Sequence, residues 1–301
     1  MKHRLTVFLL FSLAALGSSV GETPQAGVVA KGVENMYSKP DDASDVVSQA
    51  LLGVTVKILA SEKNAKAEDW YRIETPDTYQ GWMAASSLQI YKAGEPAYAS
   101  RGKVFEITSL LALVHETPDV TEKKPLVKAP ISVCLEADDP GERWCPVTLP
   151  CGAKGHIQID DGVLRQAGFK RPRLAPEETA ALAQRFLGLP YQWGGNSPLG
   201  IDCSGFVQLI YRLSGVEILR DADIQLTKSG LVEVARGEED TADLVFFGKA
   251  PDKIGHVGMM ISRTRFIHAT TYEKPVIQVS TLADAHWQAL YQGARKPEKN
   301  S

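Results

Sequence analysis

The segment from Tyr191 to Gly215 constrains the fold most strongly, because it sets one cysteine at the start of an apolar helix. Asp202 and Ser204 are residues that cap helix starts, and Gly215 stands where a helix would stop. Between these ends the apolar residues recur at helical spacing: Phe206, Val207, Leu209, Ile210 and Leu213. We therefore predict a helix with Cys203 in its first turn. The positive end of a helix favours a thiolate, so we expect the thiol pKa to be lowered.

Two histidines downstream give this cysteine a chemical context. Alone, Cys203 could be a buried structural cysteine. Three runs of β-forming residues follow the helix, over residues 243–247, 255–261 and 265–269. The last two carry His256 and His268, and a turn at residues 262–264 would pair them as an antiparallel hairpin with both rings on one face. Cys203, His256 and His268 then fit a nucleophile, its base and a group that orients the base.

These motifs resemble those of the NlpC-type cysteine peptidases. The resemblance covers residues 177–297 and rests on these segments: Asp-Cys-Ser-Gly-Phe at 202–206, Asp-Leu-Val-Phe-Phe at 243–247, Gly-His-Val-Gly at 255–258, Ile-His-Ala at 267–269, Tyr-Gln-Trp-Gly-Gly at 191–195 and Arg-Asp-Ala-Asp-Ile-Gln at 220–225. It implies an α+β papain-like fold. It also implies hydrolysis of the amide between the γ-carboxyl of D-glutamate and a diamino acid in bacterial cell-wall peptides, with no metal or organic cofactor.

The same resemblance suggests a role for each site residue. Cys203 would attack the carbonyl, His256 would take and return the proton, and His268 would hold His256. The Cys203 backbone N–H and the Tyr191 hydroxyl would meet the oxyanion, although Tyr191 could equally be a core residue. Asp202 and Ser204 would line the pocket for the L-Ala-γ-D-Glu part of the substrate.

Short β-type runs broken by Pro, Asp and Gly fill residues 27–160. A glycine follows each of two tryptophans at the same distance, Trp70 to Gly81 and Trp144 to Gly155, which indicates a tandem repeat. We predict two small all-β barrels, over residues 27–93 and 101–160, separated at residues 91–96. They resemble bacterial SH3-like domains, the first more clearly than the second.

The first barrel also resembles those of peptidases that trim peptides with a free N-terminal L-Ala. In that subgroup an acidic side chain and a tyrosine of the barrel face the ammonium of the ligand, and Asp45 and Tyr79 occupy the matching positions. Asp202 is a second candidate for this duty. A buried ammonium without a carboxylate would be costly, so such a pocket must hold one. The alternative is an exposed loop aspartate and a packing tyrosine.

A basic, proline-containing connector is predicted over residues 161–176. Pro176 then begins a helix with Glu177 and Glu178 in its first turn, ended by Gly188 and Pro190. This helix would open the catalytic domain, residues 177–297.

Residues 1–21 have the pattern of a secretory signal peptide. Lys2 and Arg4 precede an apolar run from Leu5 to Leu16, which is too short to span a membrane as a mature helix. We therefore expect an exported protein, periplasmic or extracellular. The net charge of −3 and the lack of a basic cluster argue against a nucleic-acid partner.

Several alternatives stay open. In an oxidising compartment one pair among Cys134, Cys145 and Cys151 could be bridged, and a zinc site with His156 is a weaker option. The protein could be a lytic endopeptidase on intact peptidoglycan with its barrels as anchors, or an amidase or acyltransferase on the same scaffold. A non-catalytic wall-binding protein is disfavoured by the complete Cys, His, His set. The sequence leaves open diaminopimelate or lysine in the substrate, and the oligomeric state.

Overall fold

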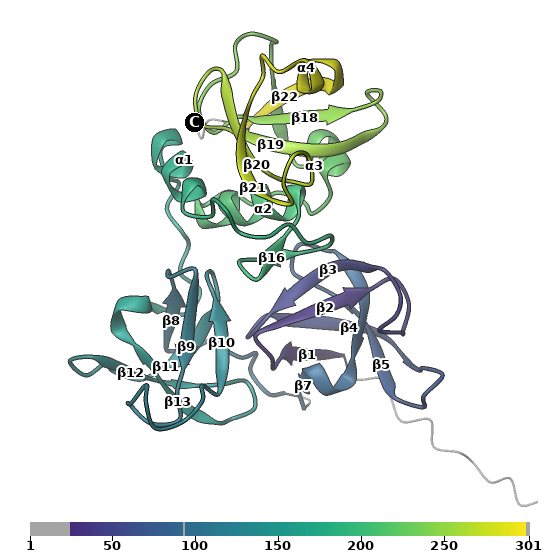
Figure 1. The fold of residues 1–301 in the computed structure, drawn as a ribbon. Helices are drawn as coiled ribbons and strands as arrows, with labels where there is room; N and C mark the ends of the chain where they lie inside the picture. The colour runs from purple at the N-terminus through teal and green to yellow at the C-terminus, as the bar shows by residue number, and fades with distance from the viewer. Residues whose placement is uncertain (1–24, 93, 299–301) are drawn as a thin grey trace, which may run out of the picture.

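The computed structural model describes residues 25–92 and 94–298 as three lobes, two of them built from strands and the third from strands and helices (Figure 1). The predicted signal peptide, residues 1–21, lies outside the described residues. Within the described ranges, no helix is long and apolar enough to cross a membrane.

The first lobe is one seven-stranded sheet in the order β3-β2-β6-β5-β4-β1-β7. Its strands are β1 (Ala26–Val29), β2 (Val33–Tyr37), β3 (Val46–Leu51), β4 (Thr55–Lys63), β5 (Asp69–Glu74), β6 (Gln80–Ala84) and β7 (Leu88–Ile90), with the 3-10 turn η1 (Ala85–Ser87) before β7. The predicted period of two is present, because Val56 and Ile58 are buried while Lys57 between them is exposed. This alternation gives the sheet one apolar face around a small core.

The second lobe has a five-stranded sheet in the order β13-β12-β11-β8-β14 and a two-stranded sheet of β10 and β9. Its elements are β8 (Lys103–Ile107), β9 (Leu111–Val114), β10 (Val127–Pro130), β11 (Cys134–Ala137), β12 (Trp144–Thr148), β13 (Lys154–Gln158), η2 (Ile159–Asp161) and β14 (Gly162–Gln166). Residues 162–166 were expected in the connector. They pair with β8 instead, so this lobe extends further than the predicted residues 101–160.

The two lobes repeat one local design. Gly81 lies opposite Ile73 in the β5–β6 pair, and Gly155 lies opposite Val147 in the β12–β13 pair. In both lobes a 3-10 turn and a final strand follow. The equal spacing from tryptophan to glycine is therefore confirmed as a shared hairpin register.

The third lobe combines helices with a six-stranded antiparallel sheet, ordered β17-β22-β18-β19-β20-β21. Its elements are α1 (Pro176–Gln184), β15 (Asn196–Ser197), β16 (Gly200–Ile201), α2 (Cys203–Leu213), α3 (Ala222–Lys228), β17 (Leu231–Val234), β18 (Leu244–Gly248), β19 (Ile254–Met260), β20 (Arg265–Thr270), β21 (Val276–Thr281), α4 (Ala285–Leu290) and β22 (Tyr291–Pro297). This arrangement confirms the expected α+β papain-like class.

Helix α2 is the buried centre of the third lobe. The Asp202 carboxylate caps it by accepting from the Gly205 N–H at 2.7 Å, and Gly215 follows its end with a φ of +76°. Its predicted apolar face packs on the sheet, where Val257 and Ile267 are buried. The helix therefore holds Cys203 directly against β19 and its neighbours.

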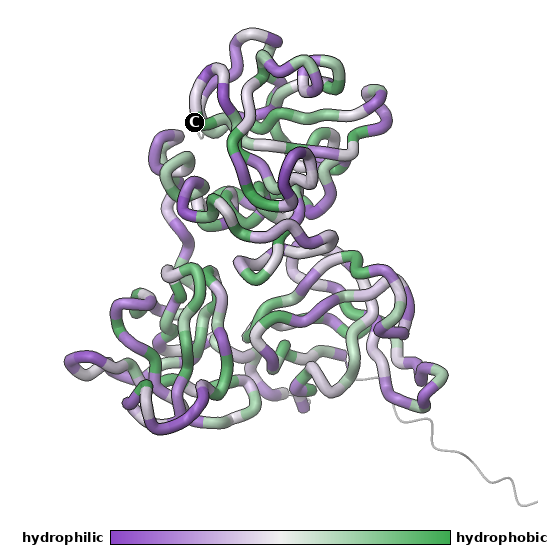
Figure 2. Tube along the Cα trace, in the orientation of Figure 1, coloured by the Kyte–Doolittle hydropathy of each residue, from purple (hydrophilic) through white to green (hydrophobic). Residues whose placement is uncertain are grey.

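The lobes are joined by apolar contacts between their cores as well as by the linking segments. Leu51 and Leu52 of the first lobe pack into the apolar cluster of the second, and Ile131 of the second packs into that of the third. Hydrophobic stretches run through the strands of each lobe, while hydrophilic segments concentrate in the outer loops (Figure 2). Of the basic connector, Arg171 pairs with the buried carboxylate of Glu106 at 2.7 Å. Such contacts favour a single relative position of the lobes.

The other cysteines are free thiols in the structure: Cys134 partly buried, Cys145 buried and Cys151 exposed. None of the pairs considered from the sequence is bridged. Among the described residues, no three His, Cys, Asp or Glu side chains are grouped as metal ligands would be.

Candidate active site

Cys203 occupies the first position of α2 and is 8% exposed. Its sulfur accepts hydrogen bonds from the backbone N–H groups of Val257 and Ser204. Since Val257 directly follows His256 in β19, this contact places the thiol beside the predicted base. The helix start and the strand thus bring together residues far apart in sequence.

The two predicted histidines form a hydrogen-bonded pair. The Nε2 atom of His256 lies 2.7 Å from Nδ1 of His268, and Nε2 of His268 lies 3.0 Å from the Ser280 hydroxyl. The chain is satisfied when each Nε2 donates to the next group, which leaves Nδ1 of His256 as the proton acceptor. His268 is fully buried, so its orientation is fixed by packing as well.

Aromatic rings surround this pair. The indole of Trp287 in α4 stacks on the His256 ring, with centroids 5.1 Å apart, and lies nearly perpendicular to the His268 ring, with centroids 4.9 Å apart. Gly258, two residues after His256 in β19, lies against Phe266 and the Cβ atom of His268 in β20. A Cβ there would come within 2.6 Å of the Phe266 ring, so only glycine leaves room for this packing. The histidine pair is thereby held rigidly from several sides.

Burial shifts the pKa of the Cys203 thiol in the direction opposite to the one expected. It raises the pKa of Cys203 to about 12, and the Asp202 carboxylate adds to the rise, while the N–H groups of Val257 and Ser204 act against it. The expectation of a lowered pKa at the helix start is therefore wrong, because desolvation outweighs the helix terminus. Burial also lowers the pKa of His256 to about 4, with nearby His286 contributing. A neutral thiol beside a neutral imidazole is the favoured resting pair, so His256 must accept the proton as the thiol attacks.

The lowered pKa of His256 predicts an unusual pH dependence of kcat/KM. His256 acts as a base only when neutral, so kcat/KM should persist at pH 5 and fall as the pH drops through about 4. An ordinary histidine would give a fall near pH 6.5. The check is a kcat/KM profile from pH 3.5 to 8, with folding followed by circular dichroism at each pH. His286→Gln should move the fall to higher pH because it removes a nearby group that lowers the pKa of His256. A fall near pH 6.5 in both proteins would contradict the argument.

The backbone at the helix start offers a donor for an oxyanion. Of the first amides of α2, that of Gly205 donates to Asp202 and that of Ser204 donates to the Cys203 sulfur. The Cys203 N–H has no carbonyl partner within the helix, since it belongs to the first turn. The half-buried Tyr191 interacts electrostatically with Cys203, and burial raises its pKa, so its hydroxyl stays protonated as a donor. The oxyanion role of these two donors stays a prediction.

Asp202 is engaged by a buried arginine. Arg220, 1% exposed, donates to its two carboxylate oxygens at 2.7 and 3.0 Å and to the Ser204 hydroxyl at 2.9 Å. This two-pronged ion pair neutralises Asp202 beside the nucleophile. Asp202 and Ser204 lie next to Cys203 as predicted, but the charge of Asp202 is already matched.

The first lobe supplies one side of this site. Ser48 accepts from Arg220 at 3.2 Å, and Gln49 pairs with the backbone and side chain of Asn196 at 3.0 and 2.8 Å. Asp77 accepts from Gln208 of α2 at 2.9 Å. Strand β3 and the β5–β6 turn are thus joined to the segment around the nucleophile by polar contacts.

The two residues predicted to face a ligand ammonium behave differently. Tyr79 is half-buried and its hydroxyl bonds to the carboxylate of Asp221, at the edge of the Asp202–Arg220 pair. Asp45 is exposed in the turn before β3, and only its backbone oxygen has a partner, the N–H of Ser38. The structure therefore brings Tyr79 to the site and leaves the Asp45 side chain outside its hydrogen-bond network.

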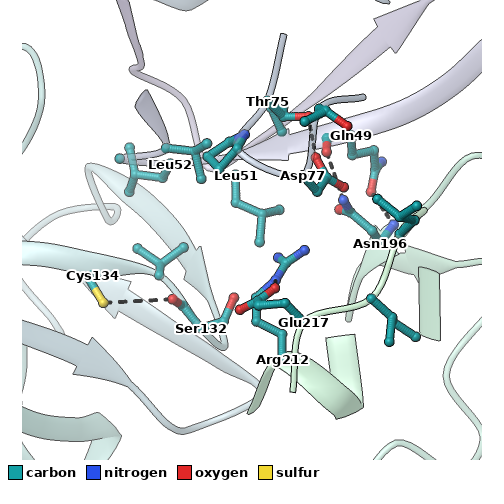
Figure 3. Close-up of a pocket in the computed structure, with 18 of the residues that line it drawn as sticks. Gln49, Leu51, Leu52, Thr75, Asp77, Ser132, Cys134, Asn196, Arg212 and Glu217 are labelled. Atoms are coloured by element: carbon teal, nitrogen blue, oxygen red, sulfur yellow. Dashed lines mark hydrogen bonds and ion pairs between the residues drawn. The ribbon is translucent and has the colours of Figure 1, made fainter. Parts of the chain in front are cut away.

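A cavity of about 770 Å³ lies where the three lobes meet (Figure 3). Its walls include Gln49, Asp77 and Asn196, which join the first lobe to the third, and Ser132 of the second lobe. This cavity therefore lies between the three lobes, and Cys203 is not part of its wall.

Sequence reasoning missed several of these residues. Arg220 belongs to the family-like segment at residues 220–225, and this position was the one signal in the sequence that could have marked it as a site residue. Ser280 and Trp287 follow the histidines along the chain, but nothing in their local pattern marks them. Ser48 and Asp77 act through contacts across lobes, which no local pattern encodes.

Comparison with known proteins finds two matching domain families. Residues 188–296 match the NlpC/P60 family, and residues 31–89 match the bacterial SH3 domain. Only the first of the two predicted SH3-like barrels is matched in this way.

Two relatives are similar along most of the chain. One is dipeptidyl-peptidase 6 of Lysinibacillus sphaericus, 28% identical over 269 residues that cover 86% of this chain and 92% of the relative. The other is a gamma-D-glutamyl-L-lysine dipeptidyl-peptidase of Bacillus cereus, 29% identical over 265 residues, or 85% of this chain and 76% of the relative.

The crystal structure of an NlpC/P60 family protein from Bacillus cereus superposes with a TM-score of 0.78 at 23% identity. It covers 90% of this chain and 99% of that one, so the shared fold includes both β-rich lobes. The chain therefore carries an NlpC/P60 cysteine peptidase domain, which holds the thiol and the two histidines, after a bacterial SH3 domain.

Proposed function

We propose that this protein hydrolyses the γ-D-glutamyl–diamino acid bond of cell-wall peptides that keep a free N-terminal L-Ala, and releases L-Ala-D-Glu. The observation that carries the proposal is the Cys203 sulfur at the helix start, bonded to the amide beside His256. The relative named gamma-D-glutamyl-L-lysine dipeptidyl-peptidase supports this bond specificity.

The first lobe supports the preference for a short N-terminal part. Its Ser48 and Gln49 bond to residues on the third lobe next to the nucleophile, so this side of the site is closed by protein. A closed end leaves room for few residues before the scissile bond, which is the property of a dipeptidyl-peptidase. An intact peptidoglycan strand needs a site open at both ends.

The reaction follows from the site geometry. His256 takes the thiol proton at Nδ1 while the Cys203 sulfur attacks the γ-carbonyl, and the oxyanion meets the Cys203 N–H and the Tyr191 hydroxyl. Collapse breaks the C–N bond, and His256 returns its proton to the departing amine. Water, activated by the same imidazole, then hydrolyses the thioester. His268 and Ser280 hold the base throughout.

The proposal also covers the second lobe, the domain division and the N-terminal residues. We infer that the second lobe is a diverged SH3-like copy, supported by its shared hairpin register and 3-10 turn. The division into barrels at residues 27–93 and 101–160, a connector and a catalytic domain at residues 177–297 follows, with β14 extending the second barrel. Export directed by residues 1–21 would bring the enzyme to wall peptides.

The proposal is tested by mass-spectrometric cleavage assays on three substrates: L-Ala-γ-D-Glu-diaminopimelate, its N-acetylated form and insoluble peptidoglycan. We expect release of L-Ala-D-Glu from the free-amine peptide, and cleavage slower by at least about 100-fold for the other two, since an unmet buried charge costs several kcal/mol. The lysine-containing peptide, run in parallel, identifies the diamino acid. Equal cleavage of all three substrates would instead show a lytic endopeptidase.

A further inference from the structure

The cavity at the junction of the three lobes is large enough to hold a small ligand. Its volume is about 770 Å³, and sites that bind small molecules usually enclose about 300–1,000 Å³. Each lobe contributes to its wall, with Leu51 from the first, Val133 from the second and Ile218 from the third. A molecule bound there would contact all three lobes without contacting Cys203.

Unusual backbone conformations are concentrated around this cavity. In the described part of the chain six residues other than glycine have a positive φ, and three of them line the cavity: Thr78 at +67°, Ala99 at +53° and Ser132 at +77°. This region of φ is strained for any residue with a Cβ, most of all for a β-branched threonine, and such strain gathers at binding sites. The conformation of the wall therefore favours a site over a simple gap in the packing.

One polar atom of the wall has no partner. Asn196 is 9% exposed, and its Oδ1 atom receives no hydrogen bond from any described residue. The orientation of this amide is fixed, because its Nδ2 donates to the backbone oxygen of Gln49 at 2.8 Å. A buried acceptor without a donor is costly, so this part of the cavity favours a ligand that brings an N–H group.

A carboxylate without a cation lies beside this amide (Figure 3). Asp77 accepts from the Thr75 hydroxyl at 2.5 Å and from Gln208 at 2.9 Å, which are both neutral donors, and no described residue forms an ion pair with it. A half-buried carboxylate in this state attracts an ammonium group, which also supplies the N–H donor that Asn196 lacks. This side of the cavity therefore suits a free N-terminus.

Two cations with unused donors line the part of the wall that belongs to the third lobe. Arg212 reaches Glu217 only through Nε, at 3.7 Å, and its guanidinium donates no hydrogen bond to any described residue. Lys228 is exposed and forms no ion pair within the described ranges. Together they would attract a carboxylate. Figure 3 shows Arg212 on a different side of the cavity from Asp77, with the apolar side chain of Leu51 on the wall.

We propose that this cavity binds a short peptide that has apolar side chains and two free ends. Its ammonium donates to Asp77 and Asn196, and its carboxylate accepts from Arg212 and from Lys228. The apolar wall takes the side chains between the two ends. This is a second peptide site, separate from the active site, and it does not rest on the proposed function. Because Asp77 also accepts from α2, the bound peptide would hold the first lobe against the catalytic domain.

The probe for this site is the tripeptide L-Ala-L-Leu-L-Ala, which contains no γ-glutamyl bond. Isothermal titration calorimetry on the full chain should give a dissociation constant below about 1 mM. The N-acetylated and the C-amidated tripeptides should each bind at least about 10-fold more weakly, because each loses one charged contact. Equal binding of the three peptides, or no binding of the unblocked one, would overturn the inference.

Two variants locate the bound peptide. Lys228→Glu changes an exposed side chain, so circular dichroism should match the wild type, but the unblocked tripeptide should bind about 10-fold more weakly and the C-amidated form should bind no more weakly than to the wild type. Asp77→Asn should weaken the unblocked tripeptide about 10-fold and leave the N-acetylated form unchanged. The charge-matched control is Lys253→Glu, an exposed lysine outside the cavity, which should bind all three peptides as the wild type does.

Wild-type affinity in both Lys228→Glu and Asp77→Asn would place the peptide elsewhere and overturn the assignment. An equal loss in Lys228→Glu and Lys253→Glu would do the same, because it would reflect net charge alone. Cleavage of γ-D-glutamyl peptides is a separate measurement, so the proposed function and this second site can each fail without the other.

Discussion

Cys203→Ser should lower kcat/KM for the γ-D-glutamyl peptide by at least about 1,000-fold while the protein stays folded. The hydroxyl of serine is a far weaker nucleophile in a site built to pass one thiol proton to His256. The side chain is nearly isosteric, so the contacts of α2 with β19 should survive. The measurement is steady-state kinetics on L-Ala-γ-D-Glu-diaminopimelate, with circular dichroism and the melting temperature as folding readouts.

A matched control separates this thiol from the others. Cys151 is exposed in the second lobe, and Cys151→Ser should retain wild-type kinetics and stability. If Cys203→Ser kept more than a tenth of the wild-type activity, Cys203 would not be the nucleophile. The same would follow if a thiol-alkylating reagent abolished the activity of Cys203→Ser.

Arg220→Met should cost about 3–5 kcal/mol of unfolding free energy, the largest stability effect we expect at the site. It removes five hydrogen bonds and leaves the buried Asp202 carboxylate without a cationic partner; the two side chains are only 1% and 10% exposed. Asp202 also caps α2, so its disturbance should reach the nucleophile and lower activity. Urea unfolding followed by tryptophan fluorescence measures the loss of stability.

Two further variants test the cause. Arg263→Ala breaks an exposed ion pair with Asp240, at 77% and 59% exposure, and should change stability by less than about 1 kcal/mol. Adding Asp202→Asn to Arg220→Met removes the stranded charge and should recover part of the lost stability. If the double variant were no more stable than Arg220→Met, a stranded charge would not be the reason for the loss of stability.

Local signals in the sequence determined much of this protein. Asp202, the apolar spacing and Gly215 define α2 within a stretch short enough for capping and periodicity to act alone. The hairpin that joins His256 to His268 follows from alternation and a short turn in the same way. The positions of the proposed nucleophile, base and orienter were therefore predictable because each lies in a segment whose structure depends on near neighbours.

Only the tertiary structure decided the electrostatics of the site and the burial of its carboxylates. The pKa of Cys203 follows from how completely the fold removes water, a quantity that no helix start contains, and so desolvation overcame the helix terminus. Ser48 and Arg220 are 172 residues apart in sequence, and their bond exists because β3 docks beside α2. Likewise, residue type alone does not distinguish the carboxylate of Asp45 from that of Asp221. The packing of the first lobe exposes one and turns the other toward Tyr79, because burial and partners, unlike residue type, are set by contacts between distant segments.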